Sequence, residues 1–413
     1  MEISPERVYG AKVASVLGPT IRSRFALGGM GSFLFGAASM FATMYSTQAI
    51  LPELGREFGV SAAASGLSIS VLIVSLACGA WLWGPASDRI GRRRSLVLAS
   101  ALLIVPTALL ALAPTFEALL VVRAAQGLCM PGLLTVGVPY IAEVFVPRLG
   151  TRAMGLYLAA LVVGGLVGRL GVALVTAELG WRAGVGMLTL MPLAATIVMR
   201  RSLPPDAAVP SKHRIDRATL AGLLRNRTLV GATLAGSGLF FGFVAAFSYV
   251  DYRLQGPPFS LSPTAASLIF VLWLAGGIGP SAGRIAGSVG WRRVATTALG
   301  LSAVGLGLTL VPALPALVAG LALFAVANFA GVTSTQLGVA ESSRTDRGAA
   351  SAVYYSTYYL AGALGAYAPG LAWRVFGWDG VVGLALCGFA IGLAGVVATA
   401  ATARRFSLAR AES

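Results

Sequence analysis

The chain has 413 residues, of which 57% are apolar and 11% are charged, with a net charge of +16. Soluble domains carry about 25% charged residues, so this composition excludes an ordinary soluble protein and indicates a polytopic membrane protein. One histidine, in a polar loop, and three cysteines, inside apolar segments, argue against catalytic and metal sites, so we expect no enzyme activity, metal or cofactor.

Apolar segments of roughly 20 residues follow one another along the chain, which is the length that a helix needs to cross a bilayer. Helices are favoured over strands because a helix satisfies its own backbone groups in lipid. The sequence predicts an all-α membrane protein with twelve spans, at 25–47, 63–83, 95–113, 117–140, 153–177, 181–199, 228–251, 264–286, 293–311, 315–338, 349–372 and 379–400.

Basic residues are concentrated in alternate loops of this arrangement. If the N-terminus is cytoplasmic, most of the 31 Lys and Arg residues lie on the cytoplasmic face. The positive-inside rule then predicts that both termini are cytoplasmic. The +16 charge is explained by topology, and we expect no nucleic-acid partner.

Several landmarks recur about 200 residues apart, which indicates an internal repeat. Gly84 corresponds to Gly283, and Gly180 corresponds to Gly377, each near a predicted loop. We expect a cytoplasmic tail (1–24), a six-helix bundle (25–200), a linker (201–227), a second bundle of the same orientation (228–400) and a C-terminal tail (401–413).

The run GPASDRIGRRR at 84–94 joins the second and third predicted spans. A tight turn with one acid and four arginines cannot lie in lipid, so it forms a loop at one membrane face. The pattern G-x-x-x-D-R-x-G-R-R resembles the loop between helices 2 and 3 of the major facilitator superfamily of secondary transporters.

That resemblance implies a cytoplasmic gate, in which Asp88 faces the N-terminal end of helix 11 and closes the two halves. The expected gate residues are Gly84, Asp88, Arg89, Gly91 and Arg92, and the facing loop holds Glu341, Arg344, Asp346 and Arg347. The second-half copy has Gly287 in place of the acid, so the gate is expected to be one-sided. A purely topological anchor is the alternative.

Arg123 and Gln126 lie in the fourth predicted span, three residues apart and so on one helix face. Arg123 is on the order of 10 Å into the membrane, where a charge is costly and indicates function. The pattern R-x-x-Q-G resembles a superfamily motif, and in its drug–proton antiporters this arginine is linked to proton coupling. The alternative is a structural arginine bonded to carbonyls of neighbouring helices.

Arg169 adds a second cation within the fifth predicted span. The surrounding sequence GGLVGRLG resembles the antiporter motif G-x-x-x-G-P-x-x-G-G, with Arg169 in place of its proline. With an arginine at this position, the sequence resembles a subgroup of the bacterial drug/sugar efflux branch, the arabinose efflux-like proteins of the inner membrane. The resemblance extends over about residues 25 to 400.

All fifteen acids lie in tails, loops or span ends. Because arginine effectively never deprotonates, proton coupling has to use Asp251, Glu117 or Glu53 near the outer mouth, or the substrate itself. Two buried arginines without a buried acid also suit an anionic substrate, and we expect an empty cavity that is net positive.

Polar and aromatic side chains in the spans complete the expected cavity. Tyr355, Tyr358 and Tyr359 are spaced to share a helix face in span 11, where they either line the cavity or serve in packing. Gln48 in the outer part of span 1 and Asn328 in span 10 are further candidates.

These features predict a secondary transporter of the bacterial inner membrane that works by alternating access. Proton-coupled export of small amphipathic or drug-like molecules is the leading expectation. The alternative is transport of a small organic anion or sugar derivative bound by Arg123 and Arg169, and a membrane sensor or lipid-modifying enzyme is a third reading. The expected partners are substrate, protons and the bilayer, with the proton gradient as energy source and a monomeric chain.

Overall fold

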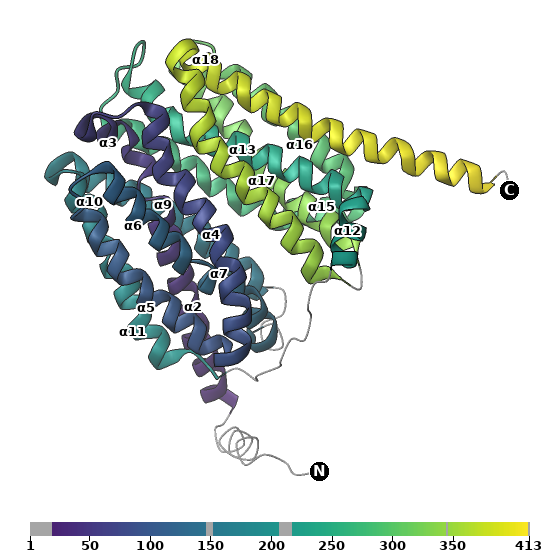
Figure 1. Ribbon diagram of the computed structural model, residues 1–413, viewed down its shortest axis with the longest axis horizontal. Coiled ribbons are helices and arrows are strands. Elements are labelled where there is room, and N and C mark those ends of the chain that lie inside the picture. The colour runs from purple at the N-terminus through teal and green to yellow at the C-terminus, as the bar shows by residue number, and fades with distance from the viewer. Residues whose placement is uncertain (1–18, 146–151, 206–216, 344–345, 412–413) are drawn as a thin grey trace.

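The computed structural model describes residues 19–145, 152–205, 217–343 and 346–411, and every regular element in these ranges is a helix. Most of the predicted N-terminal tail, part of the linker (206–216) and Arg344 of the predicted gate lie outside the described residues. Figure 1 shows the helices as two groups that lie side by side, with the first part of the chain in one group and the last part in the other.

The first group, called here the N-terminal half, begins with a long helix and ends before the linker. Its elements are α2 (Pro19–Met44), the 3-10 turn η1 (Gln48–Ile50), α3 (Leu51–Phe58), α4 (Ala62–Ile90), α5 (Arg92–Ala111), α6 (Phe116–Cys129), α7 (Pro131–Tyr140), the π-helical turn η2 (Ile141–Phe145), α9 (Arg152–Leu179), α10 (Trp181–Met187) and α11 (Leu190–Ser202).

The second group, called here the C-terminal half, follows the short helix α12 (Arg217–Arg225). Its elements are α13 (Arg227–Gln255), α14 (Pro263–Ser267), the 3-10 segment η3 (Leu268–Ile278), α15 (Gly279–Val289), α16 (Trp291–Leu308), α17 (Leu314–Ser342) and α18 (Arg347–Ala411). The backbone of α18 is non-helical at Gly377, so this element is two helices joined at a kink.

Within the described ranges, eight helices are long and apolar enough to cross a membrane. A ninth is obtained if the bent pair Pro263–Gly277 and Ser281–Val289, at 49°, is one span. One of the eight, Gly348–Thr399, covers both the eleventh and twelfth predicted spans. The total of twelve and the orientation of the termini stay predictions.

Backbone geometry repeats at the offset that the sequence landmarks share. Gly91 and Gly290 each precede a helix with φ of 89° and 92°, and Gly180 and Gly377 have φ of 82° and 56°. These left-handed conformations favour glycine because it has no Cβ. Ser61 and Ser262 likewise cap α4 and α14 by accepting a backbone N–H bond at 3.2 Å. The matching features support two tandem halves, while the exact boundaries stay a prediction.

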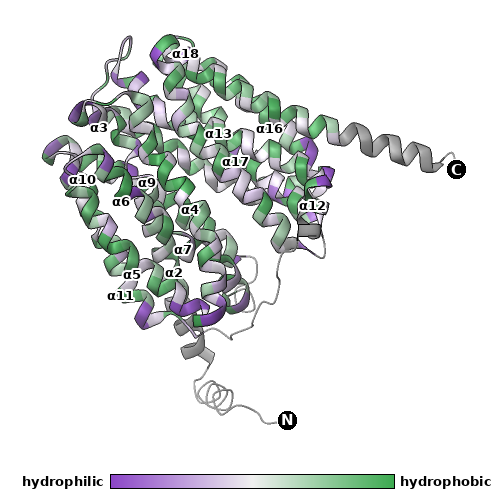
Figure 2. Ribbon diagram, viewed as in Figure 1, coloured by the Kyte–Doolittle hydropathy of each residue, from purple (hydrophilic) through white to green (hydrophobic). Residues whose placement is uncertain are grey.

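Hydropathy follows this architecture. In Figure 2 the hydrophilic residues gather toward the helix ends, near α3 and α10 and around α12, and hydrophobic residues follow the long helices. The helix α13 is the most enclosed candidate span, with 83% of its most apolar window buried. It packs along α18 over much of its length.

The two halves meet near α3. Among the described residues, four hydrogen bonds join them, and all lie toward the α3 end of α4 and α13: Gln48–Ser248, Ser70–Ala363, Tyr249–Ala62 and Tyr252–Leu51. At the same place α4 and α18 approach so closely that a Cβ on Gly66 would lie 2.1 Å from the carbonyl oxygen of Ala366. The structure is thus closed at the α3 end.

Candidate functional site

A buried polar bridge centred on Arg169 joins the two halves. Gln48 Oε1 accepts from Arg169 Nε at 2.8 Å and also from Nη2, while Gln48 Nε2 donates to Ser248 Oγ at 3.0 Å. The carbonyl of Gly165, one turn earlier in α9, accepts from Arg169 Nη1 at 2.8 Å. The structure thereby brings together two predicted site residues, Gln48 and Arg169, and attaches them to α13.

Aromatic rings enclose the Arg169 guanidinium. Its Cζ lies 3.5 Å from the ring centroid of Trp273 in η3 and 4.2 Å from that of Tyr45. Phe270 lies at 5.3 Å. Cation–π contacts of this kind are strongest when desolvated, and Arg169 is fully buried. Trp273 and Ser248 were not among the predicted site residues, although Ser248 precedes Asp251 by one helical turn.

Asp251 corrects the expectation that the spans hold no buried acid. It lies within α13, is only 1% exposed, and neither carboxylate oxygen has a hydrogen-bond partner. Its charge and that of Arg169 interact, although the two side chains do not form an ion pair. A buried acid therefore lies near Arg169, and the expectation of a net positive cavity stays a prediction. The cause is tertiary: η1 and α3 cover this end of α13.

Arg123 is also fully buried, but its donors are already occupied. Its guanidinium donates to the backbone carbonyls of Thr43, Met44 and Ser68 at 2.6–3.0 Å. It also donates to Gln126 Oε1 at 2.9 Å, and Gln126 donates to Thr107. Thr43 and Met44 are at the C-terminal end of α2, where helix carbonyls lack partners. This geometry favours the structural interpretation of Arg123.

The predicted tyrosines of α18 form one aromatic cluster. Tyr358 stacks on Phe240 of α13 at 4.0 Å, and Tyr355 stacks on Tyr359 at 6.0 Å. Tyr355 is 39% exposed, whereas Tyr354 is buried and hydrogen-bonded to Thr335 at 2.9 Å. The cluster therefore packs within the C-terminal half, and the ring of Tyr355 stays partly accessible.

Asn328 of α17 is the remaining predicted cavity residue. It is 2% exposed, and its side-chain oxygen has no hydrogen-bond partner. A buried amide oxygen without a partner is costly, so this atom is available to a bound polar group. Among the described residues, no hydrogen bond joins it to the Arg169 bridge.

The predicted loop at 84–94 is helical except at Gly91, because α4 continues to Ile90 and α5 begins at Arg92. The arginines of this segment tie helices of the N-terminal half together. Arg92 forms a 2.5 Å ion pair with Glu143 of η2. Arg93 donates to the carbonyls of Arg200 and Leu203 at 2.7 and 2.8 Å, which satisfies the C-terminal end of α11. These contacts show that the segment holds helices together, whereas its role as a gate stays a prediction.

The predicted gate acid, Asp88, lies in the last turn of α4 and is exposed. Within the part of the chain that the structure describes, it makes no hydrogen bond or ion pair with the start of α18. Arg89 is exposed as well, and Gly84 has open space around it. In this conformation the gate residues are apart from their predicted partner.

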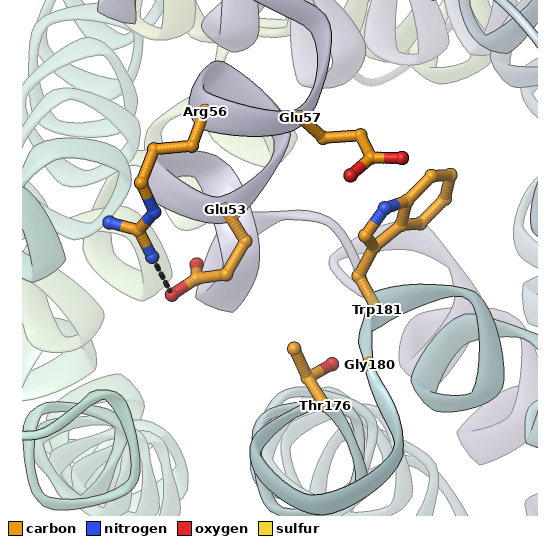
Figure 3. A pocket seen from close by; sticks show the side chains of 6 residues that line it. All are labelled: Glu53, Arg56, Glu57, Thr176, Gly180 and Trp181. Atoms are coloured by element: carbon orange, nitrogen blue, oxygen red, sulfur yellow. Dashed lines mark hydrogen bonds and ion pairs between the residues drawn. The ribbon is translucent and has the colours of Figure 1, made fainter.

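A polar pocket of about 330 Å³ opens where α3 meets the turn between α9 and α10. Figure 3 shows its lining: Glu53, Arg56 and Glu57 from α3, and Thr176, Gly180 and Trp181 from the other side. Glu53 pairs with Arg56 at 2.9 Å, and Glu57 pairs with Arg182 at 2.5 Å. Within the described ranges, no group of three or more metal-ligating side chains is present.

Comparison with known proteins places this geometry in a family. A model of the Major Facilitator Superfamily matches residues 33–366. The chain is 31% identical over 362 residues to the MFS-type transporter YybF of Bacillus subtilis, covering 86% of this chain and 89% of YybF. It is also 31% identical over 353 residues to the inner membrane transport protein YnfM of Escherichia coli, covering 84% of this chain and 85% of YnfM.

Solved structures show the same fold at lower identity. The nucleoside transporter NupG superposes with a TM-score of 0.71 at 12% identity, covering 91% of this chain and 99% of NupG. A bacterial homologue of the human lysosomal transporter Spinster, in an inward-facing and occupied conformation, superposes with a TM-score of 0.70 at 15% identity. The match covers 95% of this chain and 98% of that homologue. The relatives are transporters, so the chain is a multi-pass membrane transporter and not an enzyme, and it belongs to the Major Facilitator Superfamily.

Proposed function

We propose that this transporter couples substrate movement to protons and exports small amphipathic molecules across the bacterial inner membrane. The observation that carries the proposal is Asp251, a buried carboxyl without a hydrogen-bond partner beside the Arg169 bridge. A titratable group in such a place is a functional candidate because its charge is costly there unless it is compensated.

The position of Asp251 supports coupling to the movement of the halves. The Gln48–Ser248 bond joins the halves one helical turn from Asp251, so a change of charge on the carboxyl acts directly on that contact. Loss or gain of a proton thereby biases two arrangements of the same interface, which is the requirement for coupled transport.

The aromatic residues of α18 support amphipathic molecules as substrates, and the name of one relative supports antiport. Tyr355, Tyr358 and Tyr359 provide amphipathic surfaces suited to rings and alkyl groups. A relative named MFS antiporter QDR3, from Candida albicans, is 26% identical over 175 residues.

A small organic anion is the second candidate substrate, and Arg169 is the observation that favours it. Its guanidinium is fully buried, and its charge interacts with that of Asp251, so protonation of Asp251 would leave the positive charge of Arg169 uncompensated. A relative named as a probable 4-methylmuconolactone transporter is 30% identical over 202 residues. Arg123 is less suited to this role because four of its five N–H donors already bond to the protein.

The test uses the full chain in proteoliposomes with an imposed pH gradient and ethidium as the amphipathic probe. We expect gradient-driven ethidium flux that Asp251→Asn lowers about tenfold or more, since a buried proton carrier is removed. Gradient-driven flux that is unchanged in Asp251→Asn overturns the proposal. Flux of 4-methylmuconolactone but not ethidium, lost in Arg169→Gln, favours the second candidate.

A further inference from the structure

Asp251 lies on the face of α13 that contacts η1 and α3. Ser248, Asp251, Tyr252 and Gln255 are spaced three or four residues apart and share that face. Ser248 accepts from Gln48, and Tyr252 donates to the carbonyl of Leu51 at 2.9 Å. Asp251 is therefore held between two anchored points, beside the segment that leads from Gln48 into the first turn of α3.

Glu53 belongs to that first turn and connects this region with the pocket of Figure 3. Its side chain is 13% exposed; one carboxylate oxygen pairs with Arg56, and the other has no hydrogen-bond partner. The charges of Glu53 and Asp251 act on each other. Glu53 thus has an accessible pocket on one side and the buried acid on the other.

The rest of the pocket is suited to a hydrated path. Thr176 Oγ1 and Trp181 Nε1 line it, are buried, and have no hydrogen-bond partner. Buried polar atoms of this kind are commonly satisfied by ordered water in a cavity that is large enough. The pair Glu57 and Arg182 is about half exposed, at 41% and 46%, so the pocket reaches the protein surface.

We propose that Glu53 is the proton relay of Asp251 and that the pocket bounded by α3, α9 and α10 is the proton entrance at this end of the molecule. The inference rests on the proposed function of Asp251 and adds the route by which its proton arrives. If the predicted orientation is right, the entrance opens to the outer face of the membrane.

The transfer is balanced without any further reactant. A hydronium ion in the pocket protonates the Glu53 carboxylate and leaves water. Glu53 passes a proton to the Asp251 carboxylate, directly or through one water, and is then ready to receive the next. The route is available while the halves are closed at the α3 end, so proton loading does not require that seal to open.

The surroundings of Glu53 suit a group that exchanges protons. Burial raises the pKa of Glu53 above its ordinary value of 4.5, against the opposing charge and hydrogen bond of Arg56. The titratable and charged groups around it are Arg56 and Glu57 on α3, Asp251 and Tyr252 on α13, and Arg182 on α10. Glu57 differs because its bond to Arg182 lowers its pKa, which keeps it ionised.

The experiment follows protonation of Asp251 by time-resolved infrared spectroscopy of the full chain after a jump from alkaline to acidic pH. The carboxyl band absent from Asp251→Asn identifies the residue. We expect Glu53→Gln to reach the same band amplitude about tenfold more slowly, since one positioned acid–base group is lost. Glu53→Asp should restore most of the rate. An exposed acid at the end of α9 supplies the matched control, and Glu178→Gln should leave the rate unchanged.

Wild-type rates in Glu53→Gln, or equal slowing in Glu178→Gln, overturn the relay. This failure is distinct from that of the proposed function. If Asp251→Asn abolishes gradient-driven flux while Glu53→Gln has a wild-type protonation rate, only the relay is lost. If Asp251→Asn keeps that flux, the coupling role of Asp251 is lost, whatever Glu53 does.

Discussion

Two arginines of equal burial have different surroundings, and this difference separates their roles. Arg123 donates to three backbone carbonyls and one amide oxygen, all within the N-terminal half. Arg169 lies at the contact between the halves, with aromatic rings of η3 on its face and an acid nearby. Burial alone therefore does not identify the functional cation; the partners of each donor do.

At the residue scale, the contacts of Arg123 predict a stability effect. In Arg123→Met the carbonyls of Thr43, Met44 and Ser68 lose the bond that Arg123 donates, although Thr43 still accepts from Ser46 Oγ at 2.9 Å. A buried carbonyl that is left without a donor costs roughly 1–3 kcal/mol. We expect a clearly lowered thermal midpoint of the purified protein and a smaller drop in Arg123→Lys, which keeps part of the donor set. A normal midpoint together with lost proton coupling would restore the interpretation taken from the antiporter motif.

At the element scale, the crossing of α4 and α18 depends on two glycines. A Cβ on Gly66 would lie 2.1 Å from the Ala366 carbonyl oxygen, and one on Gly370 would lie 2.4 Å from Ala63 Cα. No side chain fits at either position unless the helices separate. The crossing is therefore a seal formed by backbone contact, with Tyr249 adding a 2.6 Å hydrogen bond to Ala366 within α18.

Gly66→Val is expected to open that seal. The added side chain pushes α4 from α18 and breaks the 2.6 Å bond from Ser70 to the Ala363 carbonyl. In a background without the native cysteines, a Ser70→Cys probe should react with a water-soluble maleimide about tenfold faster, which corresponds to a shift of about 1.4 kcal/mol between closed and open forms.

Gly383→Val is the matched control, because Gly383 also lies in α18 but has no atom within 4 Å of its added Cβ. Its labelling rate should equal that of the parent protein. Equal acceleration in both variants would mean that the crossing is not the seal, and no acceleration in either would mean that the helices accommodate the valine.

The elements themselves were largely predictable, whereas their burial was not. Apolar length placed the start of α4 and both ends of α5 within three residues, although α4 continues to Ile90 and the predicted span ended at 83. Glycine landmarks matched left-handed backbone positions at Gly180 and Gly377. The burial of Asp251 was not foreseen, because hydropathy along one helix does not report that η1 and α3 fold over its end. The aromatic enclosure of Arg169 by η3 has the same cause, since Trp273 is distant in sequence.

At the scale of the whole molecule, the structure is one member of a two-state cycle. The halves are hydrogen-bonded near α3, while Asp88 at the other end of α4 is exposed. Alternating access requires the opposite end to close when the α3 end opens. The first turn of α18 begins at Arg347, and a helix N-terminus attracts a carboxylate. We therefore expect Asp88 to face this turn in the state that is closed at that end.

Asp88→Asn should therefore lower the population of the state closed at that end without affecting membrane insertion. A carboxylate at a helix N-terminus contributes about 0.3–2 kcal/mol, which predicts a population change of roughly twofold to thirtyfold. Spin-label distances between the ends of α4 and α17 measure it directly. Asp379→Asn, an exposed acid just after the α18 kink, should leave those distances unchanged. If Asp88→Asn also leaves them unchanged, the loop serves only to anchor helices, as the contacts of Arg92 and Arg93 already show it does.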